Sequence, residues 1–255
     1  MNSLKYFLKS INIGSTKSTR LFSLLIISTI IIHVSAWAAN YKFGTFLEVS
    51  RSAPKFYNML YHGKDGGYFE HFQYILLIWC SILSSLWIVN RKFFEALSIP
   101  IIYFYLFLDD SLKLHDQLIS DFILKLLDKV PLFDQNIVRS QDIAEWINWL
   151  FVFVVILIIS FPGLKSRSFE VRKFMKNNFI FFFVLTFFGV FLDLIEANIN
   201  SWLPIYFRSG IFKEFLILIE EIGEIGTISL MCIWLFQIND NGKRDLSLFS
   251  SSRED

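Results

Sequence analysis

The sequence predicts an all-α membrane protein, a bundle of six transmembrane helices with one short helix at the membrane interface. Hydrophobic residues make up 54% of the 255 residues, and the mean hydropathy is +0.50, which is too apolar for a soluble domain of this length. Apolar stretches of about 20 residues, the length that crosses a bilayer, recur along the chain. The net charge of +1 gives no indication of nucleic-acid binding, and no motif indicates nucleotide binding.

The first predicted span follows a basic N-terminus. Residues 1–20 contain lysine and arginine and no acid, and residues 21–39 form an apolar run long enough to cross the membrane. The tripeptide Ala36-Trp37-Ala38 resembles a signal-peptidase site. We expect a retained anchor, because both the basic region and the apolar run are long for a signal peptide; removal of residues 1–38 is the alternative.

The second and third spans are separated only by a short basic turn. Span two runs from Glu70 to Val89, and span three runs from Phe93 to about Gln117. In residues 118–133 the apolar side chains share one helical face and the charged ones take the other. This pattern predicts a short helix lying in the membrane interface, with an ordinary surface helix as the alternative.

Three further spans complete the bundle. Span four has its core at Trp146–Phe161, span five runs from Phe179 to about Asn200, and span six runs from Ile211 to Ile238. The tail is Ser-rich and charged, which predicts disorder. The predicted organisation is a basic cytoplasmic N-terminus at 1–20, a six-span membrane domain at 21–238 and a disordered cytoplasmic tail at 239–255.

The basic residues predict the orientation. With six spans, the N-terminus, Arg91 and Lys92, the segment 164–177 and Lys243 and Arg244 all fall on one side. The positive-inside rule makes that side cytoplasmic. We therefore expect a multi-pass protein of the inner (plasma) membrane with both termini in the cytoplasm and with membrane lipids as its surroundings.

Acidic and histidine side chains gather in the halves of the spans that this topology turns outward. An ionised carboxylate near the bilayer centre costs roughly 2.5–3.5 kcal/mol, so these groups are expected to face the bundle interior. Gly223 and Gly226 allow close helix approach on span six, and Asn148 extends a looser polar stripe on span four. The carboxylates and imidazole that define the predicted cluster are Asp109, His115, Asp116, Asp193, Glu196, Glu220, Glu221 and Glu224.

An excess of carboxylates over cations predicts a divalent metal or shared protons in the cluster. Oxygen ligands with one or two imidazoles suit iron, manganese, zinc or calcium, and no HExxH motif is present. His115 beside Asp116 is the candidate catalytic pair for proton transfer. On one continuous helix, Asp109 and Asp116 would share a face. The candidate metal ligands are Asp109, His115, Asp193, Glu196, Glu220 and Glu224.

The sequence leaves three functions open, and it does not decide whether the protein is an enzyme. A metal site acting on a lipid or lipid-linked substrate is the first. A small cation- or proton-coupled transporter or channel is the second, because intramembrane carboxylates also mark such pathways. A non-catalytic membrane scaffold is the third. Cys80 and Cys232 are widely separated in apolar runs and are interpreted as small core residues.

Short segments resemble a family of uncharacterised polytopic bacterial inner-membrane proteins. The segments are Phe107-Leu-Asp-Asp110, Leu114-His-Asp116 and Glu220-Glu-Ile-Gly-Glu224, with Asp65-Gly-Gly-Tyr-Phe-Glu70 before span two. The family has Leu-Asp-acid, then His-acid, then Glu-Glu and a further Glu near a Gly. The resemblance covers spans two, three and six, and it implies the same site residues without an activity. Asp116 stands where glutamate is more usual in the family.

Overall fold

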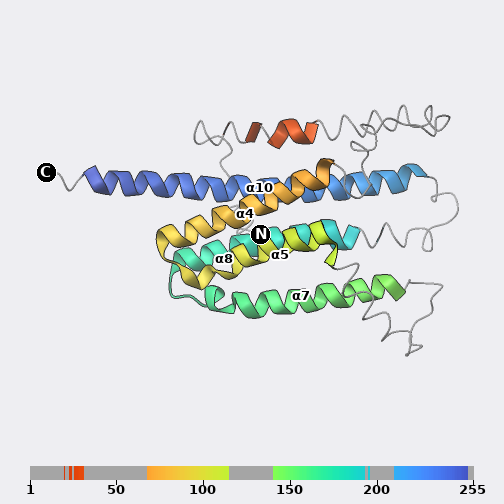
Figure 1. Cartoon of the computed structure of the whole chain (residues 1–255), viewed down its shortest axis with the longest axis horizontal. Coiled ribbons are helices and arrows are strands. Elements are labelled where there is room, and N and C mark those ends of the chain that lie inside the picture. The colour runs from red at the N-terminus through yellow and green to blue at the C-terminus, as the bar shows by residue number, and fades with distance from the viewer. Residues whose placement is uncertain are drawn as a thin grey trace. The chain divides into compact units, whose positions relative to one another are not determined.

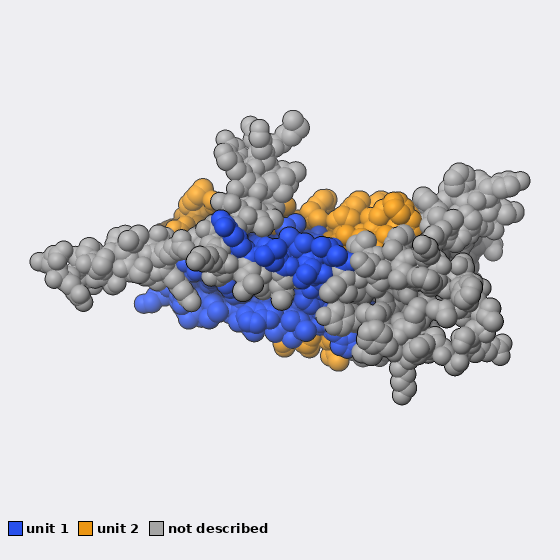
Figure 2. All heavy atoms as spheres, turned by 90° about the horizontal axis from the view of Figure 1, so that it is seen from above, with its two compact units in different colours: residues 1–94, 225–255 blue, residues 95–224 orange. Residues whose placement is uncertain are grey.

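A computed structural model describes residues 20, 23–24, 26–31, 68–114, 140–192, 195 and 210–251, and every regular element in these ranges is helical (Figure 1). The chain divides into two compact units, coloured separately in Figure 2. Unit 1 comprises residues 1–94 and 225–255, and unit 2 comprises residues 95–224. The all-α prediction is therefore confirmed for the described part of the chain.

Unit 1 is built on α4 (Tyr68–Arg91) and the second half of α10 (Gly210–Ser251). Two contacts join these helices: the Cys80 thiol lies 4.0 Å from the carbonyl oxygen of Ile228, and Asn239 Nδ2 donates to the carbonyl of Leu83 at 3.0 Å. Leucine and isoleucine side chains of both helices are buried. α4 ends where Lys92 adopts a left-handed conformation with φ 58°.

Unit 2 contains α5 (Ser98–Leu112), α7 (Ser140–Leu164), α8 (Phe169–Thr186) and the part of α10 up to Glu224. A short 3₁₀ turn, η1 (Phe94–Ala96), precedes α5, and a π-helix, η3 (Phe187–Leu192), continues α8. α7 packs against both α5 and α8. The colour gradient in Figure 1 shows that α7 runs antiparallel to α5 and α8.

Among the described residues, three helical segments are long and apolar enough to cross a membrane: Glu70–Arg91, Ile147–Leu164 and Phe169–Leu192. Many of their large apolar side chains are exposed, as Leu150, Phe151 and Ile158 are on α7. Such an apolar surface is favourable in the hydrocarbon of a membrane and unfavourable in water. The membrane character predicted from the composition is confirmed at this level, while the predicted span at 21–39 and the interfacial helix at 118–133 lie largely or wholly outside the described residues.

Helix boundaries differ from the predictions in three places. α8 begins at Phe169, so much of the basic segment 164–177 is helix and not loop; Ser168 caps it by accepting from the backbone N–H of Val171 at 3.4 Å. α5 ends at Leu112, short of the expected Gln117, because Lys113 takes the left-handed conformation (φ 49°) and its N–H bonds the carbonyl of Asp109. α10 continues past the expected end at Ile238 to Ser251.

Candidate functional site

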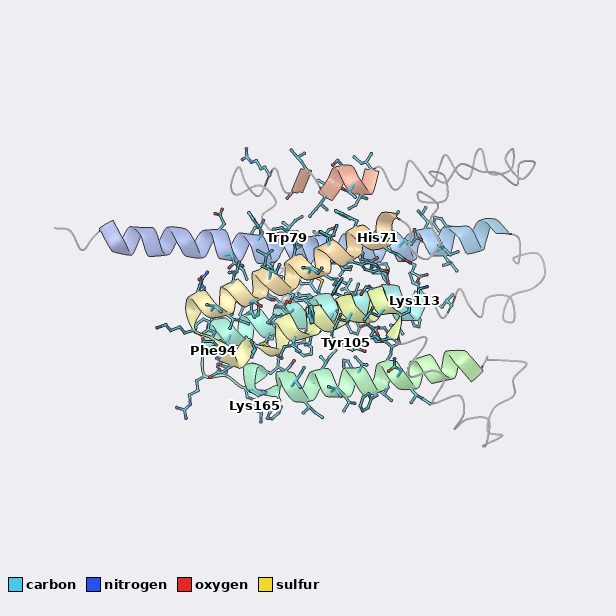
Figure 3. All side chains as sticks on the ribbon, viewed as in Figure 1. His71, Trp79, Phe94, Tyr105, Lys113 and Lys165 are labelled. Atoms are coloured by element: carbon cyan, nitrogen blue, oxygen red, sulfur yellow. The ribbon has the colours of Figure 1, made fainter. Side chains whose placement is uncertain are left out.

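Asp109 is the most deeply buried of the predicted site residues that the structure describes. Its side chain is 1% exposed, near the C-terminal end of α5. The hydroxyl of Tyr105, one turn earlier on the same helix, donates to Asp109 Oδ1 at 3.4 Å. Figure 3 labels Tyr105 and also Lys113, the residue that terminates α5. The next residue, Asp110, is only partly buried, so the two adjacent carboxylates have different environments.

Two hydrogen bonds fix how α5 aligns with its neighbours. Ser160 Oγ on α7 donates to Ser98 Oγ on α5 at 3.2 Å, and the Tyr103 hydroxyl on α5 donates to Asn178 Oδ1 on α8. Both contacts are fully buried. Each bond marks a point where two helices lie side by side. A helix rises about 1.5 Å per residue, which gives the distance of other residues from that point along the helix axis.

A second carboxylate is held against the π-helix. A Cβ built on Gly189 would overlap Glu224 Oε1, and one built on Gly223 would overlap the ring of Phe188. The start of α10 therefore packs against η3 with glycine at both points of closest approach. π-Helical turns are rare and occur frequently at functional sites, and Glu224 packs against this one at Gly189.

Helix rise places the carboxylates of Asp109 and Glu224 about 7 Å apart along the helix axes of unit 2. Asp109 is 6 residues beyond Tyr103, which is about 9 Å along α5. Gly189, against which the Glu224 carboxylate packs, is 11 residues beyond Asn178, which is about 16 Å along α8 and η3. The two differ by about 7 Å, slightly more than one turn. Within the described residues no group of three or more His, Cys, Asp and Glu is found that could hold a metal ion.

The predicted site residues divide into two sets. Asp109, Glu220 and Glu224 are described; the glutamates are partly buried on α10, as is Glu221. Four others, His115, Asp116, Asp193 and Glu196, lie outside the described residues. The prediction that Asp109 and Asp116 share a face of one helix stays a prediction, because Asp116 is not described; α5 itself ends at Leu112.

Sequence reasoning missed two features of this site. Tyr105 precedes Asp109 by one turn, and this i, i+4 spacing could have identified it as a partner. Gly189 gave no signal, because nothing in the sequence marks a π-helix at 187–192.

The described residues define a helical protein with three helices able to cross a membrane and with a buried carboxylate inside unit 2. Comparison with protein-family models, curated proteins and solved structures finds no match to this chain. The case for a function rests on the side chains themselves.

Proposed function

We propose that the chain is a six-span inner-membrane protein, with both termini in the cytoplasm, that binds a divalent cation at a carboxylate site in unit 2. The cation site acts on a lipid or a lipid-linked substrate. Asp109, Glu220 and Glu224 supply carboxylate oxygens, and His115, Asp193 and Glu196 complete the ligand set in this proposal. His115 with Asp116 handles protons.

The observation that carries the proposal is the burial of Asp109. A carboxylate that is 1% exposed in an apolar helix bundle loses most of its hydration, which costs several kcal/mol unless positive charge or a proton compensates. The Tyr105 hydroxyl provides a neutral donor at 3.4 Å. A divalent cation would add positive charge beside this buried carboxylate.

A bound divalent cation would supply Lewis acidity, which polarises a carbonyl or phosphoryl oxygen. The residues of this chain would hold the cation and exclude water from it. The apolar outer surface of α7, with Leu150, Phe151 and Ile158 exposed, supports a substrate with acyl chains, since such chains approach from the lipid without leaving it.

Elemental analysis of the detergent-purified protein tests the proposal. We expect a divalent metal at close to one per chain in the wild type and a large loss in Asp109→Asn. Asp110→Asn is the matched control, because this neighbour is only partly buried, and it should retain the metal. Wild-type protein without metal, together with cation or proton flux in liposomes, would replace this proposal with a transporter.

A further inference from the structure

One exposed face of α8 and the start of η3 is basic near the beginning of the helix and aromatic further along. The positions around the helix axis, at 100° per residue, differ from that of the first residue by at most about 40°. We call this face the α8 stripe. Its exposed residues are Phe169, Lys173, Lys176, Phe183 and Phe187. Ile180 lies on the same stripe and is partly buried.

The opposite face of α8 is the one that packs inside unit 2. Asn178, which is about 180° around the axis from Phe169, is fully buried and accepts a hydrogen bond from Tyr103 of α5. Met175 is also buried, and its sulfur would lie 2.9 Å from a Cβ built on Gly163 of α7. The stripe therefore points away from the helices that hold α8 in place.

Other cations at this end of unit 2 are engaged by the fold. Lys165 follows α7 directly (Figure 3), and its Nζ lies 4.7 Å from the centroid of the Phe161 ring. Arg172 Nη1 donates to the carbonyls of Ser166 and Arg167, which secures the turn between α7 and α8.

Lys173 and Lys176 differ in this respect, because both are exposed. Residues at i and i+3 of a helix are neighbours on its surface, so the two ammonium groups can bind the oxygen atoms of a single anion. Glu170 is the nearest acid in the sequence, and it lies about 100° away from Phe169 around the axis. The stripe itself therefore carries positive charge only.

The length of the stripe matches one leaflet of a bilayer. The segment Phe169–Leu192 is long and apolar enough to cross a membrane. Phe187 is 11 residues beyond Lys176, which is about 16 Å along the helix. Half of the hydrocarbon core of a bilayer is about 15 Å thick. When Phe187 lies at the midplane, the lysines therefore reach the level of the lipid headgroups, where such side chains keep their charge in water.

We propose that the α8 stripe is a binding site for an anionic phospholipid. Lys173 and Lys176 bind the phosphate oxygens of the headgroup, and an acyl chain lies along Ile180, Phe183 and Phe187. A zwitterionic headgroup carries its own cation, which the lysines repel, so the site selects a lipid with net negative charge. The inference does not depend on the cation site proposed above, because the stripe contains no carboxylate.

Titration of the full-length protein in non-ionic detergent with phosphatidylglycerol or with phosphatidylcholine of the same acyl chains tests the proposal. The lipid-dependent rise in Tm gives the affinity, and the wild type should bind phosphatidylglycerol more tightly. Lys173→Gln with Lys176→Gln should weaken that binding about 25-fold, since each cation near a lipid headgroup contributes about fivefold. The matched control is Lys165→Gln with Arg167→Gln, which removes the same charge from the same end of unit 2 and should keep the affinity.

A second measurement locates the acyl chain. Phe183→Trp places a fluorophore on the stripe, and Phe153→Trp places one at an exposed position of α7. Phosphatidylglycerol with a brominated acyl chain should quench the added fluorescence of Phe183→Trp at lower lipid concentration than that of Phe153→Trp. In the Lys173→Gln, Lys176→Gln background this difference should disappear.

Three results would each overturn the inference. They are equal wild-type affinity for the two lipids, an equal loss of affinity in the two double variants, and equal quenching of the two added tryptophans. The metal content of the protein, which tests the proposed function, is measured separately and decides nothing about the lipid site.

Discussion

The carboxylate of Glu224 lies directly against the backbone of Gly189, with no room for a side chain between them. The contact joins α10 to the π-helix inside unit 2, and it fixes the position of one of the proposed cation ligands. A substitution as small as one methyl group at position 189 therefore acts on a carboxylate more than 30 residues away in the sequence.

Gly189→Ala should displace the Glu224 carboxylate and weaken cation binding. The added Cβ overlaps Oε1, and because this atom is the end of a flexible side chain, the carboxylate can move aside with only a small loss of stability. Unfolding in detergent measures the stability, and cation-dependent Tm measures the binding. Gly226→Ala is the control, because no atom lies within 4 Å of its Cβ position, and it should be neutral or stabilising by up to about 1 kcal/mol. Equal effects at both glycines would contradict the prediction.

Gly223→Ala should be rescued by a smaller side chain at position 188. The new methyl group would overlap the Phe188 ring, so the single variant should lose stability, and Phe188→Leu alone should lose contacts. Together the two changes should cost less than the sum of the single effects, with a coupling of about 0.5–3 kcal/mol. A double-mutant cycle of unfolding free energies measures this coupling. Strict additivity would show that the two residues are not in contact.

Tyr103→Phe should destabilise unit 2 modestly. It removes the hydroxyl that donates to Asn178 Oδ1 across α5 and α8, and interhelical hydrogen bonds of this type average about 0.6 kcal/mol, with a maximum near 1.7 kcal/mol. Denaturant unfolding in micelles measures the loss. In the Asn178→Leu background the same substitution should have almost no further effect; a full second loss would mean that the hydroxyl has another main partner.

Prolonged incubation with a small, membrane-permeant oxidant should link Cys80 and Cys232 by a disulfide, at a slow rate because buried thiols react poorly. The two free thiols interact with one another inside unit 1, where both are fully buried, although they are far apart in the sequence. Cleavage at methionine places Cys80 in the fragment 60–175 and Cys232 in the fragment 232–255. These fragments should migrate together without reductant and separate with it. Cys80→Ser is the control, and separate migration after complete oxidation of the wild type would disprove the contact.

The sequence predicted the helices best where apolar runs end abruptly. α4 and α7 lie close to the expected spans at 70–89 and 146–161 because charged residues or turns flank both runs. The start of α8 was missed because lysine and arginine were interpreted as loop residues, although such side chains extend from a helix and keep their charges in water. The end of α5 was missed because a lysine in the left-handed conformation has no sequence signature.

The candidate site was predicted only in part for a related reason. Burial of Asp109 follows from a carboxylate in an apolar run, and the sequence was sufficient for that. The sequence also showed Asn148 on a polar stripe, but whether an amide has hydrogen-bond partners depends on the neighbouring helices. The π-helix that receives Glu224 is likewise a packing feature, and 3.6-residue periodicity cannot reveal it.

Close packing around Gly163 holds one end of α7 against its neighbours in unit 2. A Cβ there would lie 2.8 Å from the carbonyl oxygen of Glu95 and 2.9 Å from Met175 Sδ. Because the carbonyl of Glu95 belongs to the backbone and cannot rotate aside, any side chain at position 163 would push α7 away from this contact. The missing side chain of one glycine therefore sets how closely this helix approaches the rest of unit 2.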